Sequence, residues 1–240
     1  MGKSLTRKII EAHYVSGSMK AGEEVFIKVD QTLTHDINAV MTYLAFEAIG
    51  LDRIRTECSV SYLDHNLLYV DHKTPDDHIY LQSAAEHFGV HVSRPGNGIC
   101  HAVQVSRFGA PGKVSMGGDS HTPHGGSIGM LCIGVGGMDV ATAIMGTFAS
   151  AADILGDQID ILAEVHEKEE YEINDNLIIK PLPEEEAKKV EIVRGPNIKF
   201  LPVPEVPVQH LKVPVSLKGG DNISTDDITP ASAEFYTMRS

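Results

Sequence analysis

The sequence predicts a doubly wound α/β/α domain, followed by an extended linker and the opening of a further domain. Short apolar runs alternate with amphipathic runs over the first 150 residues, which is typical of repeated strand–helix units. Four of the strand-like runs are followed by polar clusters. Because the carboxyl ends of parallel strands share one edge of a sheet, we expect a single site there. Its members are Gln31, Asp64 with His65, His101, and Asp119 with Ser120 and His121.

Helices are expected where apolar residues recur at spacings of three and four. In the first such segment Ile9, Ile10 and His13 lie on neighbouring faces, and in the last one His78, Leu81 and Ala85 follow the same spacing. The predicted helices are 5–14, 38–49 and 77–88.

Strands are expected where apolar residues alternate with polar ones or form short continuous runs. Val25, Ile27 and Val29 alternate in this way within 24–29, and the polar run 30–36 follows at once. We interpret that run as a loop at the carboxyl end of the strand. Further strands are predicted at 59–63, 90–92, 113–116 and 128–135.

The character of the sequence changes after Gly146. A helix is expected over 148–161, and the proline-punctuated, acidic segment 174–214 is interpreted as an extended surface linker. A strand at 213–217 precedes a second polar loop at 219–230. The predicted organisation is an α/β/α domain at 1–150, a helix and linker at 151–212, and the start of another domain at 213–240.

Composition excludes several classes of function. Apolar residues make up 42% and charged residues 22%, as in ordinary soluble globular proteins. A net charge of −13 argues against binding to nucleic acid or to an anionic membrane. The sequence shows neither a membrane-spanning apolar run nor a signal-peptide pattern, so a cytoplasmic location is expected. Twelve histidines are many for 240 residues and indicate chemistry at a polar site.

The three cysteines are Cys58, Cys100 and Cys132, and no CxxC pair is found among them. A sparse, odd number of cysteines fits a reducing compartment rather than a disulfide framework. Ligands of iron–sulfur clusters usually stand at short spacings, so we interpret these three as buried, inert thiols. No residue of the chain is assigned as a metal ligand.

The segment from Gly117 to Gly126 places Asp119, Ser120 and His121 side by side between glycines. Burying three such groups without partners would cost roughly several kcal/mol, which favours a loop that faces a cleft. An Asx or Ser/Thr turn, in which Asp119 and Ser120 only satisfy backbone groups, is an equally weighted alternative. The following GVGGMD run matches the dinucleotide fingerprint poorly and is interpreted as close backbone packing.

Five motifs, in chain order, resemble the first part of an aconitase-type enzyme: DQTLTHD, YLDHN, SRPGNGICH, GGDSHTPHGG and GVGGMD. The family includes aconitase, homoaconitase and isopropylmalate dehydratase. The later segments INDNLIIKPLPEEEAKKVEIVRGPNIK and GDNISTDDITPA resemble its linker and the opening of its swivelling last domain. These segments are most similar to bacterial aconitate hydratases that carry all domains on one chain.

The resemblance implies dehydration and rehydration of citrate-like hydroxy-polycarboxylates, as in the tricarboxylic acid cycle. A [4Fe–4S] iron–sulfur cluster serves as the Lewis acid in that family. Three cysteines of a later domain hold it there, and no CTN-type motif stands between GVGGMD and the linker of this chain. The chain also stops before the glycine/serine/arginine loop of the swivel domain. We therefore expect a shortened copy with impaired or no activity alone, which a partner chain supplying the cluster region could complete.

By resemblance, Asp64 and His65 protonate the leaving hydroxyl, while His101, Asp119 and His121 share the same proton network. The residues expected to contact substrate carboxylates are Gln31, Ser120, Asp226 and Arg239. Without the resemblance, Asp64 with His65 would be interpreted as a helix N-cap beside a surface imidazole, His101 as a core histidine, and Arg239 as part of a frayed tail.

Three hypotheses remain open from the sequence. The first is an aconitase-family hydro-lyase, and the second is a non-catalytic remnant that binds polycarboxylates or another protein. The third is a cluster-free hydrolase that holds a divalent metal ion with the aspartates and histidines of the predicted site. Elemental analysis separates them, because they predict iron with sulfide, no metal, or zinc or manganese without sulfide.

Overall fold

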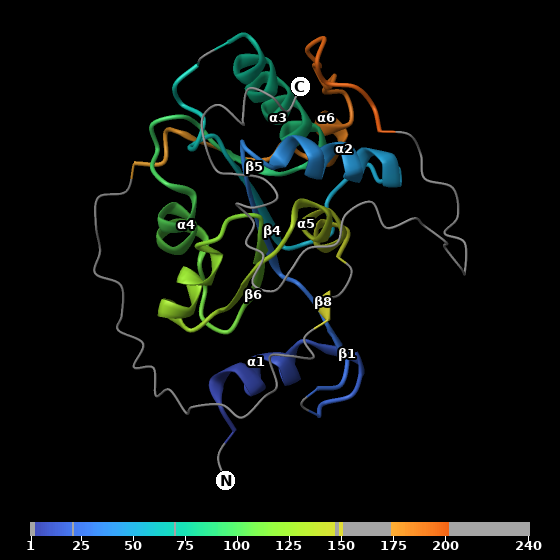
Figure 1. Cartoon of the computed structure of the whole chain (residues 1–240), viewed down its shortest axis with the longest axis vertical. Helices are drawn as coiled ribbons and strands as arrows, with labels where there is room; N and C mark the ends of the chain where they lie inside the picture. Colours follow the sequence, from blue (N-terminus) through green and yellow to red (C-terminus); the bar gives the residue numbers. More distant parts are fainter. Residues whose placement is uncertain (1–2, 21, 70, 147–148, 151–173, 202–240) are drawn as a thin grey trace, which may run out of the picture. The chain divides into compact units, whose positions relative to one another are not determined.

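The computed structural model describes residues 3–20, 22–69, 71–146, 149–150 and 174–201 (Figure 1). A six-stranded sheet with the order β7-β6-β3-β4-β5-β9 forms its centre. Neighbouring strands are parallel except for the pair β5 and β9. The strands are β3 (Gln31–His35), β4 (Cys58–Tyr62), β5 (His91–Ser93), β6 (Val114–Gly117), β7 (Leu131–Gly134) and β9 (Ile178–Ile179).

Helices cover both faces of this sheet (Figure 1). One face packs against α2 (Ala39–Ile49), α3 (Lys73–Phe88) and α5 (Gly137–Ile144), which share one large apolar core. On the other face Leu33, Val60 and Tyr62 pack against α4 (Cys100–Val103). The π-helix η1 (Gln104–Phe108) and the 3₁₀ helix η2 (Thr122–Ile128) adjoin α4. The predicted doubly wound α/β/α class is therefore confirmed.

The strand order identifies the edge at which a ligand is expected. From β3 the chain steps to β4 and then β5 in one direction, whereas β6 and β7 are added on the opposite side of β3. The direction of winding thus reverses between β3 and β6. Open α/β sheets bind ligands outside the carboxyl ends of the strands at such a reversal.

A second, three-stranded sheet has the order β1-β2-β8 and is antiparallel. It consists of β1 (Tyr14–Gly17), β2 (Val25–Ile27) and β8 (Ala149–Ser150), and α1 (Leu5–Ala12) precedes it in the chain. The side chain of Ser4 caps α1 by accepting a hydrogen bond from the Arg7 amide. Ile9 and Ile10 of α1 pack in the same buried core as β2.

Most sequence-predicted elements are confirmed. The expected helices 5–14, 38–49 and 77–88 correspond to α1, α2 and α3. The strands predicted at 24–29, 59–63, 90–92, 113–116 and 128–135 correspond to β2, β4, β5, β6 and β7. Among the described helices, none is both long and apolar enough to cross a lipid bilayer.

The interpretation of 30–36 as a loop is wrong. Residues Gln31–His35 form β3, the fully buried strand between β4 and β6. Its polar side chains are tolerated because they bond across strands; the Thr32 and Ser59 hydroxyls, for example, lie 2.5 Å apart. A strand is recognised in the sequence by alternating or continuous apolar residues, and β3 carries mostly polar ones, so the pattern did not predict it.

The described part of the expected surface linker, 174–201, belongs to the domain. Its strand β9 pairs with β5, and a short helix, α6 (Glu184–Ala187), contacts α3. Ala187 and Ile198 are buried and anchor the segment. These few apolar residues hold the segment against the domain, although most of it is exposed, as expected of an extended surface linker.

Other expectations concern residues that the structure describes only in part. Ala149 and Ser150 form β8 rather than the start of the helix predicted at 148–161. The remainder of that helix, the strand at 213–217, the polar loop at 219–230, Asp226 and Arg239 lie outside the described residues. The boundaries of the three predicted domains stay predictions.

Candidate functional site

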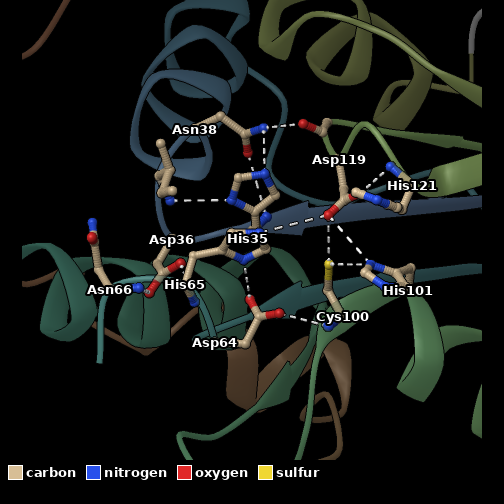
Figure 2. A network of polar contacts seen from close by, with 12 residues as sticks. His35, Asp36, Asn38, Asp64, His65, Asn66, Cys100, His101, Asp119 and His121 are labelled. Carbon is tan, nitrogen blue, oxygen red and sulfur yellow. Dashed lines mark hydrogen bonds and ion pairs between the residues drawn. The ribbon is translucent and has the colours of Figure 1, made fainter. Parts of the chain in front are cut away.

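Acidic and imidazole side chains gather where β3, β4 and β6 end (Figure 2). His35 is the last residue of β3, Asp64 and His65 follow β4, and Asp119 follows β6. The first two residues of α4, Cys100 and His101, complete the group. All five predicted catalytic residues thus lie at the reversal of strand order, with His121 on the exposed rim beside Asp119 and His101.

Asp119 lies at the centre of this group. Its side chain is 3% exposed, and its Oδ1 accepts a hydrogen bond of 3.1 Å from the Cys100 thiol. The same oxygen lies 3.6 Å from His101 Nδ1 and 3.7 Å from His65 Nε2. One carboxylate oxygen therefore faces a thiol and two imidazoles at once.

The other face of Asp119 belongs to a backbone turn. Its Oδ2 accepts a hydrogen bond from the His121 amide, and its carbonyl accepts 2.6 and 3.1 Å hydrogen bonds from the Thr122 hydroxyl and amide. Both alternatives for this segment are therefore realised: Asp119 forms an Asx turn with one oxygen and faces the site with the other. Burial raises the pKa of Asp119, but the bonds from Cys100 and His121 and the charge of His101 outweigh burial, so the pKa lies below its ordinary value.

Asp64 and His65 form a pair at the end of β4. His65 Nδ1 lies 3.0 Å from Asp64 Oδ1, and Asp64 Oδ2 accepts a 2.6 Å hydrogen bond from the Cys100 amide. The hydrogen bond to Asp64 raises the pKa of His65, against the opposing effect of burial. Because Nδ1 is engaged by Asp64, Nε2 is the ring nitrogen that faces Asp119.

The Asp36 side chain holds the backbone of His65 in place. Its two carboxylate oxygens accept hydrogen bonds of 3.1 and 2.8 Å from the amides of His65 and Asn66. His78 of α3 lies 3.0 Å from the same carboxylate. Asp36 is 3% exposed, so it positions His65 without reaching a ligand.

His35 belongs to the site although it was not among the predicted site residues. Its ring stacks on that of His65, with centroids 4.1 Å apart and an interplanar angle of 19°. Burial and the neighbouring His65 lower the pKa of His35, which favours its neutral form. Its place directly before Asp36 at the end of a strand was the available signal, and the mistaken loop at 30–36 obscured it.

The rim of the site is exposed and rich in imidazole. The rings of His101 and His121 stack with centroids 4.8 Å apart, and His124 lies 5.6 Å from His101. The His121 side chain is 70% exposed, and its Nδ1 lies 3.1 Å from the exposed Ser120 hydroxyl. Ser120 and His121 are therefore placed to meet a ligand that arrives from solvent.

Gln31 does not join the cluster, and the expectation that it lies at the carboxyl edge is wrong. It is the first residue of β3, whereas the cluster begins at the last residue, His35. The Gln31 amide donates a 2.9 Å hydrogen bond to the Phe108 carbonyl and accepts a 3.0 Å bond from Gln104. Both ends of the side chain are thus engaged internally, and its carboxylate-binding role stays a prediction.

The thiols are poorly suited to nucleophilic chemistry. Burial raises the pKa of Cys58 to about 11 and that of Cys132 to about 12. Burial and the hydrogen bond to Asp119 raise the pKa of Cys100 further. Cys100 is buried as expected and also borders the polar cluster, whereas Cys58 and Cys132 are only partly buried.

The fold and this cluster together define the class: a doubly wound α/β domain with an acid–imidazole site at its topological switch point. Residues 7–153 match the aconitase family (aconitate hydratase), and the chain belongs to that family.

Known relatives are similar to this chain at about 30% identity. A homocitrate dehydratase of Saccharomyces cerevisiae mitochondria is 31% identical over 54% of the chain and 18% of the relative. The large subunit of 3-isopropylmalate dehydratase from Elusimicrobium minutum is 30% identical over 60% of the chain and 34% of the relative. An aconitase–ribosomal protein fusion of Schizosaccharomyces pombe is 30% identical over 60% of the chain and 18% of the relative. The matched region spans between about a fifth and a third of the length of these proteins.

The described cysteines do not fit the iron–sulfur cluster typical of this family. Cys58 is the first residue of β4, Cys100 begins α4, and Cys132 lies within β7 against Gly125. Within the described ranges, no group of neighbouring metal-ligand atoms contains two of the three sulfurs. A cluster held by three cysteines therefore cannot form from these residues in the described arrangement.

Proposed function

We propose that this chain binds a small hydroxy-polycarboxylate outside the carboxyl ends of β3, β4 and β6, and that it carries the acid–base groups of an aconitase-type hydro-lyase. One observation carries the proposal: Asp64, His65 and Asp119 are aligned, with 3.0 Å between the first pair and 3.7 Å between the second. An imidazole held by one carboxylate and facing another is suited to donate and recover a proton.

The roles follow from the contacts. Asp64 orients His65, and His65 Nε2 protonates the departing hydroxyl of the substrate. Asp119, His101 and His121 form the network that returns a proton to His65 after this step, since both imidazoles lie beside the Asp119 carboxylate. The base that takes the carbon-bound proton of the substrate comes from outside the described residues. The exposed Ser120 hydroxyl contacts a substrate carboxylate. Gln31, Asp226 and Arg239 are further carboxylate contacts proposed from the family resemblance alone.

Electrostatics set the conditions for binding. The described cluster holds the acids Asp36, Asp64 and Asp119 but neither lysine nor arginine, so its positive charge comes from protonated imidazoles. A polycarboxylate is then attracted only when such rings carry a proton. Affinity for citrate is expected to be weak, about millimolar at neutral pH, as a few hydrogen bonds provide.

The proposal also covers the subgroup of the aconitase family to which this chain belongs and its location in the cell. We place this chain closest to the bacterial aconitate hydratases that carry all domains on one chain, in the cytoplasm. The Lewis acid of such a reaction comes from outside the described residues. A partner chain that brings the cluster region is one source, and the similarity to a protein named as a large subunit supports that idea.

Calorimetric titration of the purified chain with citrate tests the proposal. We expect weak binding that His101→Ala and Ser120→Ala both reduce. Ser106→Ala, at an exposed serine of η1 outside the cluster, serves as the matched control and leaves binding unchanged. Equal affinity in all three variants would contradict the proposed site.

A second assay concerns turnover. The isolated chain is expected to show no detectable dehydration of citrate or isocitrate, because removing the Lewis acid from a set of groups that act as a unit removes nearly all the rate. Robust turnover by iron-reconstituted protein would show that other groups replace the missing cysteines.

A further inference from the structure

Within the site, a thiol sulfur, an imidazole nitrogen and a carboxylate oxygen, all of which can bind a metal ion, lie close together. Cys100 Sγ lies 3.1 Å from Asp119 Oδ1 and 3.8 Å from His101 Nδ1, and the last two atoms lie 3.6 Å apart. Cys100 and Asp119 are buried, and the His101 side chain is 18% exposed. Figure 2 shows the three groups pointing toward one another from α4 and from the loop after β6.

These separations match the edges of a zinc coordination tetrahedron. Zinc binds sulfur at about 2.3 Å, imidazole nitrogen at about 2.0–2.1 Å and carboxylate oxygen at about 2.0–2.2 Å. Ligands at those distances in a tetrahedron lie about 3.4–3.6 Å from one another, so the observed edges differ from ideal by no more than about 0.5 Å.

Hydrogen bonding alone does not account for the arrangement. The 3.6 Å between His101 and Asp119, and the 3.7 Å between His65 and Asp119, are too long for direct hydrogen bonds. Two imidazoles thus face one buried carboxylate oxygen without bonding to it. Only the Cys100 thiol donates a hydrogen bond to this oxygen, and a small cation that replaced the thiol proton would lie within reach of the sulfur, the oxygen and the His101 nitrogen.

The backbone that carries these ligands is already fixed. The Cys100 amide donates to Asp64 Oδ2 at 2.6 Å, and the His121 amide donates to the second oxygen of Asp119, so that the first oxygen faces Cys100 and His101. Such support from outside the ligand shell orients metal ligands and raises their affinity.

We propose that Cys100, His101 and Asp119 bind one zinc-like divalent ion, with His65 beside it. The Cys100 S–H bond breaks, its proton leaves to solvent, and the thiolate coordinates the ion, whose fourth position holds water. A site with one thiolate, one imidazole and one carboxylate suits zinc better than magnesium or calcium, which prefer oxygen ligands. It uses a single cysteine and so differs from the family's iron–sulfur cluster.

The test titrates chelator-treated protein with Co²⁺ and Zn²⁺ under anaerobic conditions. Cobalt bound through a thiolate gives a near-ultraviolet charge-transfer band, which a site without sulfur lacks. We expect one ion per chain and that band. Cys100→Ser abolishes the band, and Cys100→Ser, His101→Gln and Asp119→Asn each weaken Zn²⁺ binding by at least about 100-fold, the upper range for altering even supporting residues. Cys132→Ser and His124→Gln are the matched controls and keep both the band and the affinity.

A measurement on the unaltered chain keeps the proposal open to refutation if a variant fails to fold. In moderate urea, which exposes the buried thiol transiently, Zn²⁺ is expected to slow the alkylation of Cys100, measured by peptide mass spectrometry, at least tenfold, while Cys58 and Cys132 keep their rates. Equal alkylation of Cys100 with and without Zn²⁺, a cobalt complex that lacks the thiolate band, or iron bound together with sulfide would each overturn the proposal. The ion shares His101 and Asp119 with the proposed proton network, so a bound ion would take these two groups out of that network. Metal binding is measured without citrate, so its failure can be distinguished from a failure of the proposed citrate site.

Discussion

Asp64 binds His65 side chain to side chain, with 3.0 Å between Oδ1 and Nδ1, and this contact determines which nitrogen of the ring faces the site. With Nδ1 donating to Asp64, the remaining nitrogen points to Asp119. If a neutral amide replaced the Asp64 carboxylate, burial would become the main influence on the pKa of the His65 ring.

The first prediction follows from that contact. Asp64→Asn lowers the pKa of His65, because the hydrogen bond to the Asp64 carboxylate is the largest cause of its raised value and burial opposes it. A histidine NMR titration measures the change. Asp52→Asn, at an exposed acid outside the cluster, is the control and leaves the titration of His65 unaltered. A His65 pKa that is the same in both variants would rule out Asp64 as its cause.

The second prediction concerns the pH dependence of citrate binding. The raised pKa of His65 means that its ring carries a proton at higher pH than an ordinary histidine, and the charge is lost as pH rises through that value. Citrate affinity should therefore fall as pH is raised from about 6 to about 8, around the ordinary histidine pKa of about 6.5. Calorimetry at constant ionic strength measures it, and His65→Gln is expected to flatten the profile. Affinity that rises with pH would contradict a site charged by imidazoles.

The third prediction concerns stability in acid. Burial raises the pKa of Asp36, but hydrogen bonds from His78 and from the amides of Asn66 and His65 outweigh it, so the pKa lies below its ordinary value. A depressed carboxyl pKa contributes stability that is present above the unfolded value, about 3.9, and is lost as pH falls through the folded value.

Asp36→Asn should therefore lower the free energy of unfolding at neutral pH by roughly 1–3 kcal/mol, since it leaves buried donors poorly matched. The loss should shrink as pH falls below about 4, because protonation then removes the same charge in the parent chain. Urea unfolding at pH 7 and pH 3.5 checks both statements. A variant as stable as the parent at pH 7 would show that Asp36 does not anchor the loop.

The fourth prediction tests the close approach of two loops. Asn38 donates a 2.5 Å hydrogen bond to the Gly118 carbonyl, and a Cβ at Gly118 would collide with the Asn38 amide group. Gly118→Ala is expected to cost roughly 1–3 kcal/mol of stability, as overpacking does. Gly126→Ala is the matched control, because a Cβ there meets nothing within 4 Å. Equal melting temperatures for the two variants would show that the loops have room to separate.

The fifth prediction separates two roles for Gln31. Because its amide bonds to Phe108 and Gln104, Gln31→Ala should lower the free energy of unfolding by roughly 1–3 kcal/mol and leave citrate affinity unchanged. Calorimetry and urea unfolding of the same sample decide the matter. A fall in citrate affinity at unchanged stability would instead support the carboxylate contact that the family resemblance implies.

The class of fold and much of the site could be predicted from local patterns in the amino-acid sequence. The alternation of apolar and amphipathic runs predicted α1, α2, α3 and most strands, because spacing along a helix or strand is a local property. Polar residues after strand-like runs indicated Asp64, His65, His101 and Asp119. Parallel strands carry their carboxyl ends to one edge, so a one-dimensional pattern was enough to bring these four together.

The position of the polar run 30–36 depends on residues that are far away in the sequence, so it could not be predicted from local patterns. A strand buried on both faces can carry Thr32 and Gln31 when neighbours satisfy them, and the neighbours, Ser59 and Gln104, are distant in sequence. Strand pairing and packing also place His35 and Cys100 in the site, and they place Gln31 at the opposite end of β3. Whether a polar side chain lines a site or completes a core depends on the partner that meets it, and that partner is set by the packing of strands and helices rather than by adjacent residues.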